Sequence, residues 1–429
     1  MDSDESSVDD EDRFKAYLQR VKDNNPHLKI FQGFMMGLSS SLTNEGWEQI
    51  GKDVSNNTHL ENINLNTGVL NKHLVSFFRG LTSSNTIKNV NLSNNVGIRA
   101  EGVRSMVPFL QNSKNCLREL DFSYNCISSE GFNVLFRALR DSPIEKLNCN
   151  RCGIESIEID SNYIPQNLKS LTLIANNINA DGCRELAKLL QGDDATLRSL
   201  ELCSNKVDDD GVEILVDALQ NNKSLKELRL SGNDGISNQG QILLLKLLND
   251  ISSIKATLLS NHTLECLSLE ILDEDEEIKT HIYMATEINS EHESNPDATG
   301  RKKVICTQMC SVKRTELAAL QEIDHSVYSE IDPLHLPEVL SLVDQHHGLG
   351  ELYVALKSSI AGVISIVNLK KCMLQEKEYH AAKAAKHAAI AAEHRAKAEE
   401  IDAKLTAIDQ AAEANQDGGY SQSNKRRRT

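Results

Sequence analysis

Residues 46–52 have the spacing of a phosphate-binding loop, GxxxxGK, with Gly46, Gly51 and Lys52 at its fixed positions. Such a loop needs a Ser or Thr after the lysine to hold magnesium, and a buried strand before the first glycine. The residue after Lys52 is Asp53, and Gly46 coincides with a glycine that begins a helix in the repeat described below. We therefore predict that these residues are structural and that the chain binds no nucleotide cofactor.

Cysteines at two places have spacings that metal or redox chemistry could use. Cys149 and Cys152 form a C-x-x-C pair, which could be a redox pair or half of a zinc site. No second pair with metal-ligand spacing follows, and Cys306 and Cys310 have no histidine cluster nearby. The spacings also assign no acid–base pair and no nucleophile–histidine couple. We predict that the chain is not an enzyme and holds no metal or other cofactor.

A stripe of histidines recurs every seven residues near the C-terminus, at His380, His387 and His394. The stripe could line a seam between paired helices, in which case protonation below about pH 6.5 would loosen the pairing. It could equally be the solvated face of a single helix, which is the interpretation we favour.

Composition and charge limit the classes of partner. The 429 residues carry a formal net charge of −16, which disfavours general binding to nucleic acid. The longest apolar run, residues 358–369, falls short of the roughly 18 residues that span a bilayer. The N-terminus lacks the features of a secretion signal, and the 10 cysteines follow no disulfide framework. We predict an intracellular protein of the cytoplasm, the nucleus or both, with no membrane contact.

The elements that would position any binding residues come from an internal repeat. Eight segments fit the template L-x-x-L-x-L-x-x-N-x-I, and they start at Leu60, Ile87, Leu117, Ile144, Leu168, Leu197, Leu225 and Leu264. A degenerate first unit begins near Gln32. The alternating apolar residues predict a short strand, the Asn can bond backbone groups at the following turn, and a Gly then begins a helix, as at Gly131, Gly182, Gly211 and Gly240. Stacked units of this kind share one continuous core.

Repeats of about 28 residues with an outer helix resemble the ribonuclease-inhibitor class of leucine-rich repeats. The resemblance covers roughly residues 28–272 and implies an α/β solenoid shaped as a horseshoe, with a parallel inner sheet and outer helices. The unit from Ile144 departs from the pattern because it lacks the helical Gly and has Pro165 where a helix should lie. We expect little or no helix there.

The template predicts a binding surface on the concave side, at the variable positions of the strands and turns. Its first part is rich in Asn, and its middle mixes both signs of charge around an aromatic residue. The predicted partner-binding residues are Asn62, Asn64, Asn89, Asn91, Glu119, Asp121, Tyr124, Lys146, Asn148, Arg151, Glu201, Glu227 and Arg229. A mixed polar face suits a protein partner better than a polyanion.

Composition outside the repeats predicts the remaining organisation. Residues 1–26 form an acidic, partly disordered segment, residues 27–272 the repeat domain, and residues 273–303 an acidic linker. Residues 304–371 form a small helical module or a cap on the solenoid, and residues 372–415 a long helix rich in Ala, Lys and Glu, an all-α region that could self-associate as a weak coiled coil. Residues 416–429 are a flexible tail ending in the nuclear-import candidate Lys425, Arg426, Arg427 and Arg428.

These observations favour a non-enzymatic scaffold for protein–protein interaction. Two alternatives remain. The repeats followed by an acidic stretch are similar to the Ran GTPase-activating proteins, which carry a functional Arg in a Thr-Gly-Arg turn. This chain has Thr67-Gly68-Val69 at the nearest match, and Arg79 or Arg99 would have to substitute. The other alternative is a nuclear adaptor directed by the basic tail.

Overall fold

The computed structural model describes residues 5–33, 42–112, 116–192, 194–269, 276–291 and 296–304. The chain divides into two compact units, residues 1–330 and 331–429, and all described residues lie in the first. The predictions for residues 305–371, 372–415 and 416–429 lie outside the described residues, as do Cys306, Cys310, the histidine stripe and the basic tail.

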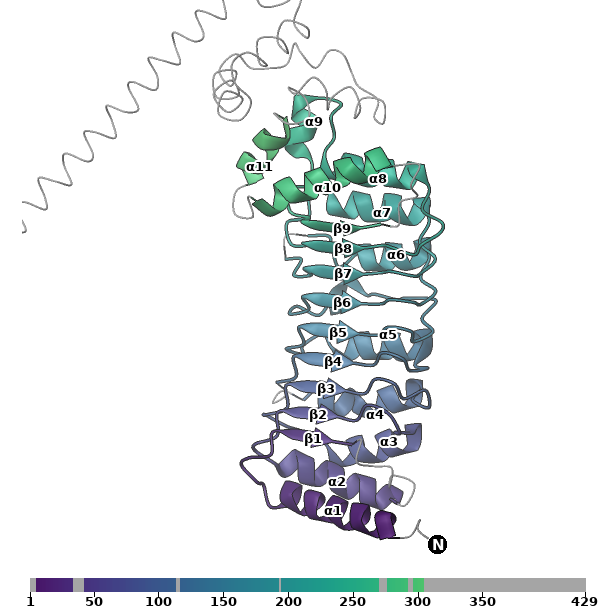
Figure 1. Cartoon of the computed structure of the whole chain (residues 1–429), viewed down its shortest axis with the longest axis vertical. Coiled ribbons are helices and arrows are strands. Elements are labelled where there is room, and N and C mark those ends of the chain that lie inside the picture. Colours follow the sequence, from purple (N-terminus) through teal and green to yellow (C-terminus); the bar gives the residue numbers. More distant parts are fainter. Residues whose placement is uncertain are drawn as a thin grey trace, which may run out of the picture. The chain divides into compact units, whose positions relative to one another are not determined.

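Nine short parallel strands form one sheet, and each pairs with the next strand along the chain (Figure 1). The strands are β1 (Ile30–Gln32), β2 (Asn62–Asn64), β3 (Asn89–Asn91), β4 (Glu119–Asp121), β5 (Lys146–Asn148), β6 (Ser170–Thr172), β7 (Ser199–Glu201), β8 (Glu227–Arg229) and β9 (Cys266–Ser268). The register runs from Leu120 through Leu147 and Leu171 to Leu200. This alignment confirms the repeat template and the predicted α/β solenoid.

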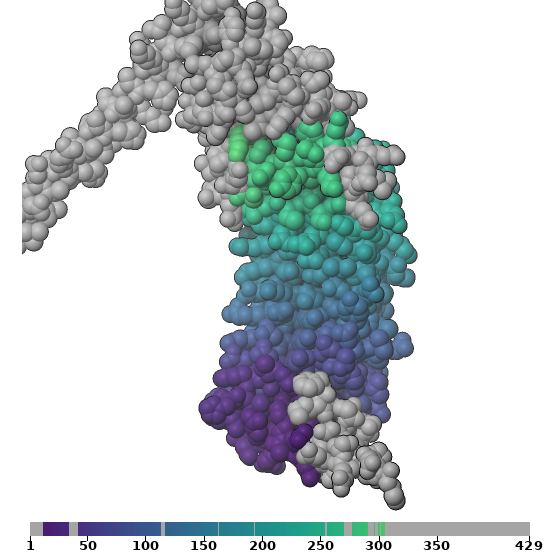
Figure 2. Space-filling model, viewed as in Figure 1, coloured from purple at the N-terminus to yellow at the C-terminus, as the bar shows by residue number. Residues whose placement is uncertain are grey.

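Helices cover one face of the sheet and leave the other face open (Figure 1). They are α2 (Asn44–Asn56), α3 (Asn71–Gly80), α4 (Ala100–Leu110), α5 (Ser128–Ala138), α6 (Ala180–Ala187), α7 (Asp209–Leu219) and α8 (Asn238–Leu248). Side chains cap several N-termini; Asp208, for example, accepts a hydrogen bond from Gly211 N at 3.0 Å. Figure 2 shows the repeats following one another in chain order without interleaving.

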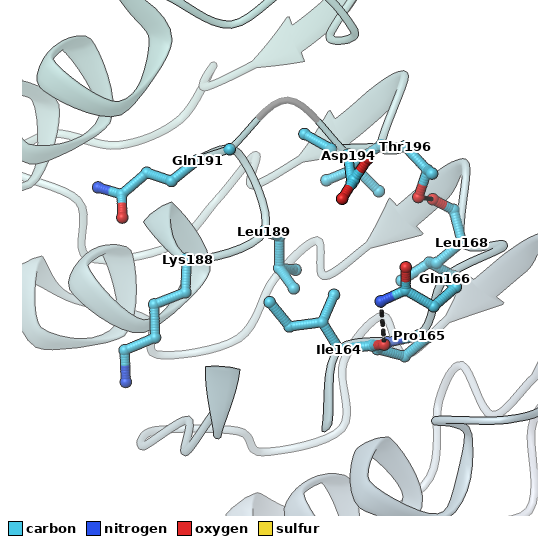
Figure 3. Close-up of a pocket in the computed structure, with 12 residues that line it drawn as sticks. Ile164, Pro165, Gln166, Leu168, Lys188, Leu189, Gln191, Asp194 and Thr196 are labelled. Carbon is cyan, nitrogen blue, oxygen red and sulfur yellow. Dashed lines mark hydrogen bonds between the residues drawn. The ribbon is translucent and has the colours of Figure 1, made fainter. Parts of the chain in front are cut away.

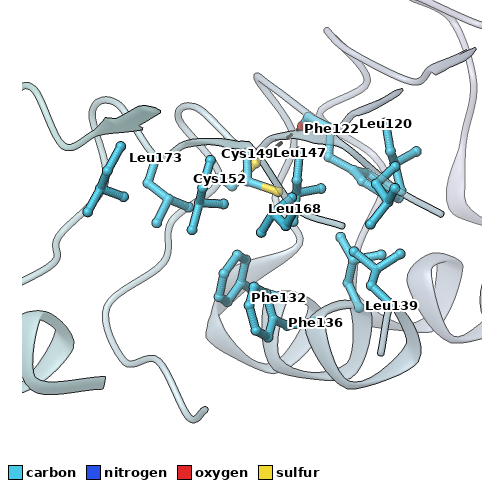
Figure 4. Packing of buried hydrophobic residues seen from close by; sticks show 14 of the residues in the cluster. Leu120, Phe122, Phe132, Phe136, Leu139, Leu147, Cys149, Cys152, Leu168 and Leu173 are labelled. Atoms are coloured by element: carbon cyan, nitrogen blue, oxygen red, sulfur yellow. Dashed lines mark hydrogen bonds between the residues drawn. The ribbon is translucent and has the colours of Figure 1, made fainter. Parts of the chain in front are cut away.

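The core lies between the sheet and the helices. Phe132 and Phe136 on α5 are buried beside Leu147 and Cys149 of the neighbouring repeat (Figure 4). Gly131 allows α5 to lie close to α4, because a Cβ atom there would lie 2.9 Å from Ile127 Cβ and 3.3 Å from Ala100 Cα.

The repeated asparagines bond the backbone as predicted. Asn125 Nδ2 donates to Phe122 O at 2.7 Å and to Leu92 O of the preceding repeat at 2.9 Å. Asn176 makes two such donations, and its Oδ1 also accepts from the backbone N–H groups of Cys152 and Ile154. Each amide therefore fastens its own turn to the previous one, which ties neighbouring repeats together.

The unit from Ile144 has only a 3-10 turn, η2 (Ser161–Tyr163), between β5 and β6, which confirms the expectation of little helix. Side chains of the flanking helices accept hydrogen bonds from its backbone. Ser129 Oγ accepts from the N–H groups of residues 155 and 156, Asn133 Oδ1 from that of residue 158, and Glu185 Oε2 from that of residue 159. The extended segment, residues 154–160, is thus held without a helix of its own.

The N-terminal end of the solenoid differs from its prediction in two respects. Helix α1 (Glu5–Lys22) occupies much of the segment predicted to be partly disordered, and it packs on α2 with Phe14 and Val21 buried. The first repeat also begins earlier than Gln32, because Leu28 and Phe31 already occupy the buried template positions. Apolar residues at helical spacing outweigh the acidic composition here.

The prediction of a linker at residues 273–303 is wrong for the described part of this segment. That part forms helices α10 (Glu276–Glu291) and α11 (Pro296–Lys303). Helix α10 packs on α8 and β9 and buries Ile278, Ile282 and Ala285, while α11 packs on α9 (Ile254–Leu259) and α10. The ammonium of Lys303 donates to Leu248 O at 2.5 Å, and burial lowers its pKa to about 7. Helix α10 thus covers the last strand, as the end of a solenoid requires.

Candidate functional site

The open face is the side of the sheet that the helices leave uncovered. In β1 to β8 the middle residue is buried toward the helices, while the first and third residues point to the open face; Leu267, in the middle of β9, is only partly buried. The structure places the predicted strand residues accordingly, on β2 (Asn62, Asn64), β3 (Asn89, Asn91), β4 (Glu119, Asp121), β5 (Lys146, Asn148), β7 (Glu201) and β8 (Glu227, Arg229). Tyr124 and Arg151 lie in the turns that follow β4 and β5.

The first part of the open face is a cluster of amide side chains on β2 and β3. Asn89 Nδ2 donates to Asn62 Oδ1 at 2.6 Å across the two strands. Asn64 Oδ1 accepts from Asn66 N at 3.1 Å, and Asn91 Oδ1 accepts from Ser93 N at 2.9 Å. These bonds fix the orientation of the amides, and they do not use the NH2 groups of Asn64 and Asn91, which remain hydrogen-bond donors.

Tyr124 and Arg151 form a pair at the centre of the described sheet. The Arg151 guanidinium lies 5.4 Å from the centroid of the Tyr124 ring, within the range of a cation–π contact. Both residues occupy the same turn position in successive repeats, with φ of 60° and 51°, so the register brings them together. Tyr124 is 47% exposed. An exposed aromatic beside an arginine is the composition that dominates binding energy in protein interfaces.

The last part of the open face is charged. Glu201 raises the pKa of the Arg229 guanidinium, and Arg229 Nη2 lies 3.5 Å from Glu227 Oε2. Ser199 Oγ donates to the same Glu227 oxygen at 3.4 Å. This part offers both signs of charge to a partner, in contrast to the uncharged amides on β2 and β3.

Sequence reasoning missed a row of charges at the template position just before each strand. The row consists of Lys29, Glu61, Lys88, Arg118, Glu145, Lys169, Arg198, Lys226 and Glu265. Glu61 pairs with Lys88 at 2.8 Å, and this hydrogen bond lowers the pKa of the Glu61 carboxyl. Glu145 pairs with Lys169 at 2.9 Å. We call these nine residues the charge row. The sequence signal that could have revealed it is the charged residue at this position in every repeat.

The residues that could have done chemistry have structural positions. Gly51 lies inside α2, where an added Cβ would meet Phe77 O at 2.1 Å, so it serves helix packing. Cys149 and Cys152 are buried in the core, and burial raises the pKa of the Cys149 thiol well above its ordinary value. Val69, at the position of the arginine in the GTPase activators, is 3% exposed.

No group of three or more His, Cys, Asp or Glu side chains in the described ranges is arranged to hold a metal ion. None of the helices in the same ranges combines the length and the apolar composition needed to cross a bilayer.

Comparisons with known proteins agree with this geometry. The family described as Leucine Rich repeat matches residues 113–132, 194–216 and 221–244, which contain β4, β7 and β8. The chain contains leucine-rich repeats. The unbroken register of the sheet extends these leucine-rich repeats to the strands outside the matched segments.

A comparison with curated proteins finds no match. Among solved structures, the chain is similar to one described as "Leiomodin-1 Actin-Binding Site 2 (ABS2)", with 14% sequence identity. The match covers 65% of this chain and 92% of that chain, with a TM-score of 0.18.

Proposed function

We propose that this leucine-rich-repeat chain is a non-enzymatic scaffold that binds another protein through its open face. The exposed pair of Tyr124 and Arg151 carries the proposal, because it combines a large ring and a guanidinium at the centre of the face. The amide donors of Asn64 and Asn91 on one side and the charges of Glu201 and Arg229 on the other supply polar contacts around that centre.

The experiment compares the full chain with two variants as bait for binding proteins. Tyr124→Ala combined with Arg151→Glu removes the ring and reverses the charge on the open face. Arg137→Glu makes the same charge reversal on the helical side, where Arg137 pairs with Glu158 at 2.8 Å. Each bound protein is then identified and titrated against all three chains. A partner retained by the wild type and Arg137→Glu but weakened at least about tenfold by the double variant supports the proposal.

Equal retention by all three chains would overturn the open face as the binding surface. The GTPase-activator alternative receives no support from Val69, which is buried and has no guanidinium to offer. Stimulation of GTP hydrolysis by a small GTPase, abolished by substituting Arg79 or Arg99, would replace our proposal with that activity.

The subclass of the repeats, the location of the chain and its self-association are further proposals. The ribonuclease-inhibitor-like subclass is supported by repeats of about 28 residues with outer helices. An intracellular location is supported by free cysteines, including the exposed Cys126. Nuclear import through residues 425–428 and self-association through residues 372–415 rest on sequence pattern alone. Deleting residues 425–428 and following the location of the chain tests the first.

A further inference from the structure

Apolar side chains project into solvent from three consecutive connections, at the edge of the open face where the strands end. Leu70 follows β2 and is 49% exposed, Val96 follows β3 and is 72% exposed, and Cys126 follows β4 and is also exposed. Tyr124, which carries the scaffold proposal, lies two residues before Cys126. We call Leu70, Val96, Cys126 and Tyr124 the edge strip.

The edge strip is continuous because the connections stack in the register of the sheet. A Cβ atom added at Gly97 would lie 3.1 Å from Leu70 Cδ2, so the Leu70 side chain lies against the turn that holds Val96. Cys126 N donates to Ile98 O of that turn at 3.2 Å. Neighbouring exposed apolar side chains mark interaction sites, whereas isolated ones need no explanation.

The opposite edge of the sheet, where the strands begin, has an apolar feature of another kind. A pocket of about 210 Å³ lies there beside the helix-free repeat (Figure 3). Leu168 and Leu189 in its lining are buried side chains of the core, and Lys188 is held by Glu185 at 2.8 Å. The pocket is a space that the missing helix leaves beside the core, whereas the edge strip projects side chains that a partner can bury.

The spacing of the edge strip selects the shape of the partner. Successive connections are about 4.8 Å apart, because neighbouring strands have that spacing. A helix running along the strip presents a side chain at every turn, about every 5.4 Å, and departs from the strip by about 1 Å over three connections. An extended segment presents side chains on one face about every 6.7 Å and departs by about 4 Å. A helix can therefore place one side chain on each connection, and an extended segment cannot.

The borders of the edge strip are polar and carry little net charge. Asn66 and Asn94 lie in the same turns and are uncharged, while Lys72, Arg99 and Glu101 are exposed at the starts of α3 and α4. Two bases and one acid leave only a small positive excess. Apolar contact must therefore supply most of the affinity, and binding should depend little on salt.

We propose that the edge strip binds one amphipathic α-helix of a partner protein, whose apolar residues at positions i, i+4 and i+7 cover Leu70, Val96 and Cys126. One end of this helix lies beside the ring of Tyr124, which joins the strip to the open face. The proposal rests on the scaffold function proposed above, because it names the kind of partner that the scaffold takes.

The probes are three fluorescein-labelled pentadecapeptides, titrated against the full chain by fluorescence anisotropy. The helical Leu peptide, SPELAKQLAELKAQK, has Leu at i, i+4 and i+7, and the Ser peptide, SPESAKQSAESKAQK, replaces these residues. The alternating peptide, SPELALQLKEAKAQK, has the composition of the first with Leu at every second position.

We expect the helical Leu peptide to bind at least about tenfold more tightly than the Ser peptide, because its three apolar side chains are buried on the strip. It should bind at least about threefold more tightly than the alternating peptide, whose Leu residues do not match the three connections. Its affinity should change less than about threefold between about 50 and about 500 mM salt.

Val96→Asp is the most informative variant, because the eighth repeat already contains the turn that it creates. Residues 95–98 read NVGI, and residues 233–236 read NDGI at the same place in the eighth repeat, so the fold accepts the aspartate. Val96→Asp should weaken binding of the helical Leu peptide about tenfold or more, since it puts a carboxylate under the apolar face of the helix. Asp234→Val makes the reverse change outside the strip and is the matched control, which leaves binding within about twofold.

Equal binding of the three peptides, no binding of the helical Leu peptide, or unchanged binding in Val96→Asp would overturn the proposal. Self-association of the full chain that Val96→Asp abolishes would identify a second copy as the occupant and would overturn it too. The scaffold function is tested separately. A partner that is lost from the double variant at Tyr124 and Arg151 but retained by Val96→Asp would leave the scaffold function standing and remove the helix from the edge strip.

Discussion

The fourth and fifth repeats of this solenoid share the same strand geometry but differ completely on the outside. The fourth places α5 behind β4, with Phe132 and Phe136 filling the core. The fifth has no α-helix behind β5, and an extended segment with Ile157 and Ile159 covers the core instead. The parallel register nevertheless continues unchanged through both. The strands and their turns therefore set the stacking, and the outer connection only has to seal the core.

The difference extends to the turn that follows each strand. In the fourth repeat Asn125 donates to two backbone carbonyls, whereas in the fifth Cys152 Sγ reaches Phe122 O at 3.2 Å as a much weaker donor. Asn176 Oδ1 accepts from the N–H groups of Cys152 and Ile154, as Asn233 Oδ1 does from those of Asn205 and Val207 in a regular repeat. The turn at Cys152 therefore keeps its bonds to the following repeat although its own donor is weak.

The largest expected effect on stability compares the helix α5, which covers the core of the fourth repeat, with the extended segment that covers the core of the fifth. Phe132→Ala removes a fully buried ring from under α5 and should cost about 3–5 kcal/mol of unfolding free energy. Ile159→Ala in the extended segment should cost about 2–3 kcal/mol, because fewer atoms are removed and the segment can settle onto the core. Urea unfolding followed by circular dichroism measures both. A larger loss for Ile159→Ala would show that the extended segment, and not the helix, is the stronger cover.

Substitutions in the turns after the strands compare the same two repeats, with smaller expected losses of stability. Asn176→Ala leaves two donors and two acceptors without their partner and should cost about 2–4 kcal/mol. Asn125→Ala should cost about 2 kcal/mol, since the Asn125 Oδ1 atom has no hydrogen-bond partner to lose. Cys152→Ala should cost about 1 kcal/mol.

The order of these three losses is the informative result, and urea unfolding again provides it. Asn205→Ala is a suitable control, because the Asn205 side chain bonds its own turn and the preceding repeat in a part of the solenoid where each repeat has its helix. If Cys152→Ala were as costly as Asn176→Ala, the thiol of Cys152 would hold this turn as firmly as the bonds from Asn176 do.

Sequence was sufficient for features that depend on local pattern. The spacing of Leu117, Leu120 and Phe122 predicts the strands, and Pro165 with the missing Gly predicts the helix-free repeat. The terminal helices were missed because acidic composition was given more weight than the helical spacing of residues such as Ile278 and Ile282. The pair of Tyr124 and Arg151 was predicted as two separate residues, since their contact depends on the register between repeats. The pairing of charges along the charge row depends on that register too.

A smaller effect tests how the extended segment is held to α6. Glu185 Oε2 accepts from Ile159 N at 2.7 Å, and Lys188 Nζ pairs with Glu185 while donating to Ile159 O at 2.9 Å. Glu185→Ala should cost about 1 kcal/mol of stability and should increase hydrogen exchange at Ile159 N more than at amides within α5. Equal increases in both places would mean that the whole repeat opens together, and that this contact does not hold the segment by itself.

The smallest expected effect is a pH dependence confined to that contact. Burial opposes ionisation of Glu185, but the hydrogen bonds from Lys188 and Ile159 N outweigh it and lower the pKa of the carboxyl. Because the folded-state pKa is depressed, the stabilisation is complete above the unfolded value of about 4.3 and is lost as the pH falls through the folded value. Protection of the Ile159 amide should therefore decrease on acidification below about pH 4 in the wild type. In Glu185→Gln, which keeps an accepting oxygen but cannot ionise, it should change little over the same range. The regular repeats provide the internal reference, because neutral asparagines hold their turns. The amide of Val207, which donates to Asn233, is one such group. If its protection fell in parallel with that of Ile159, the acid effect would be global unfolding.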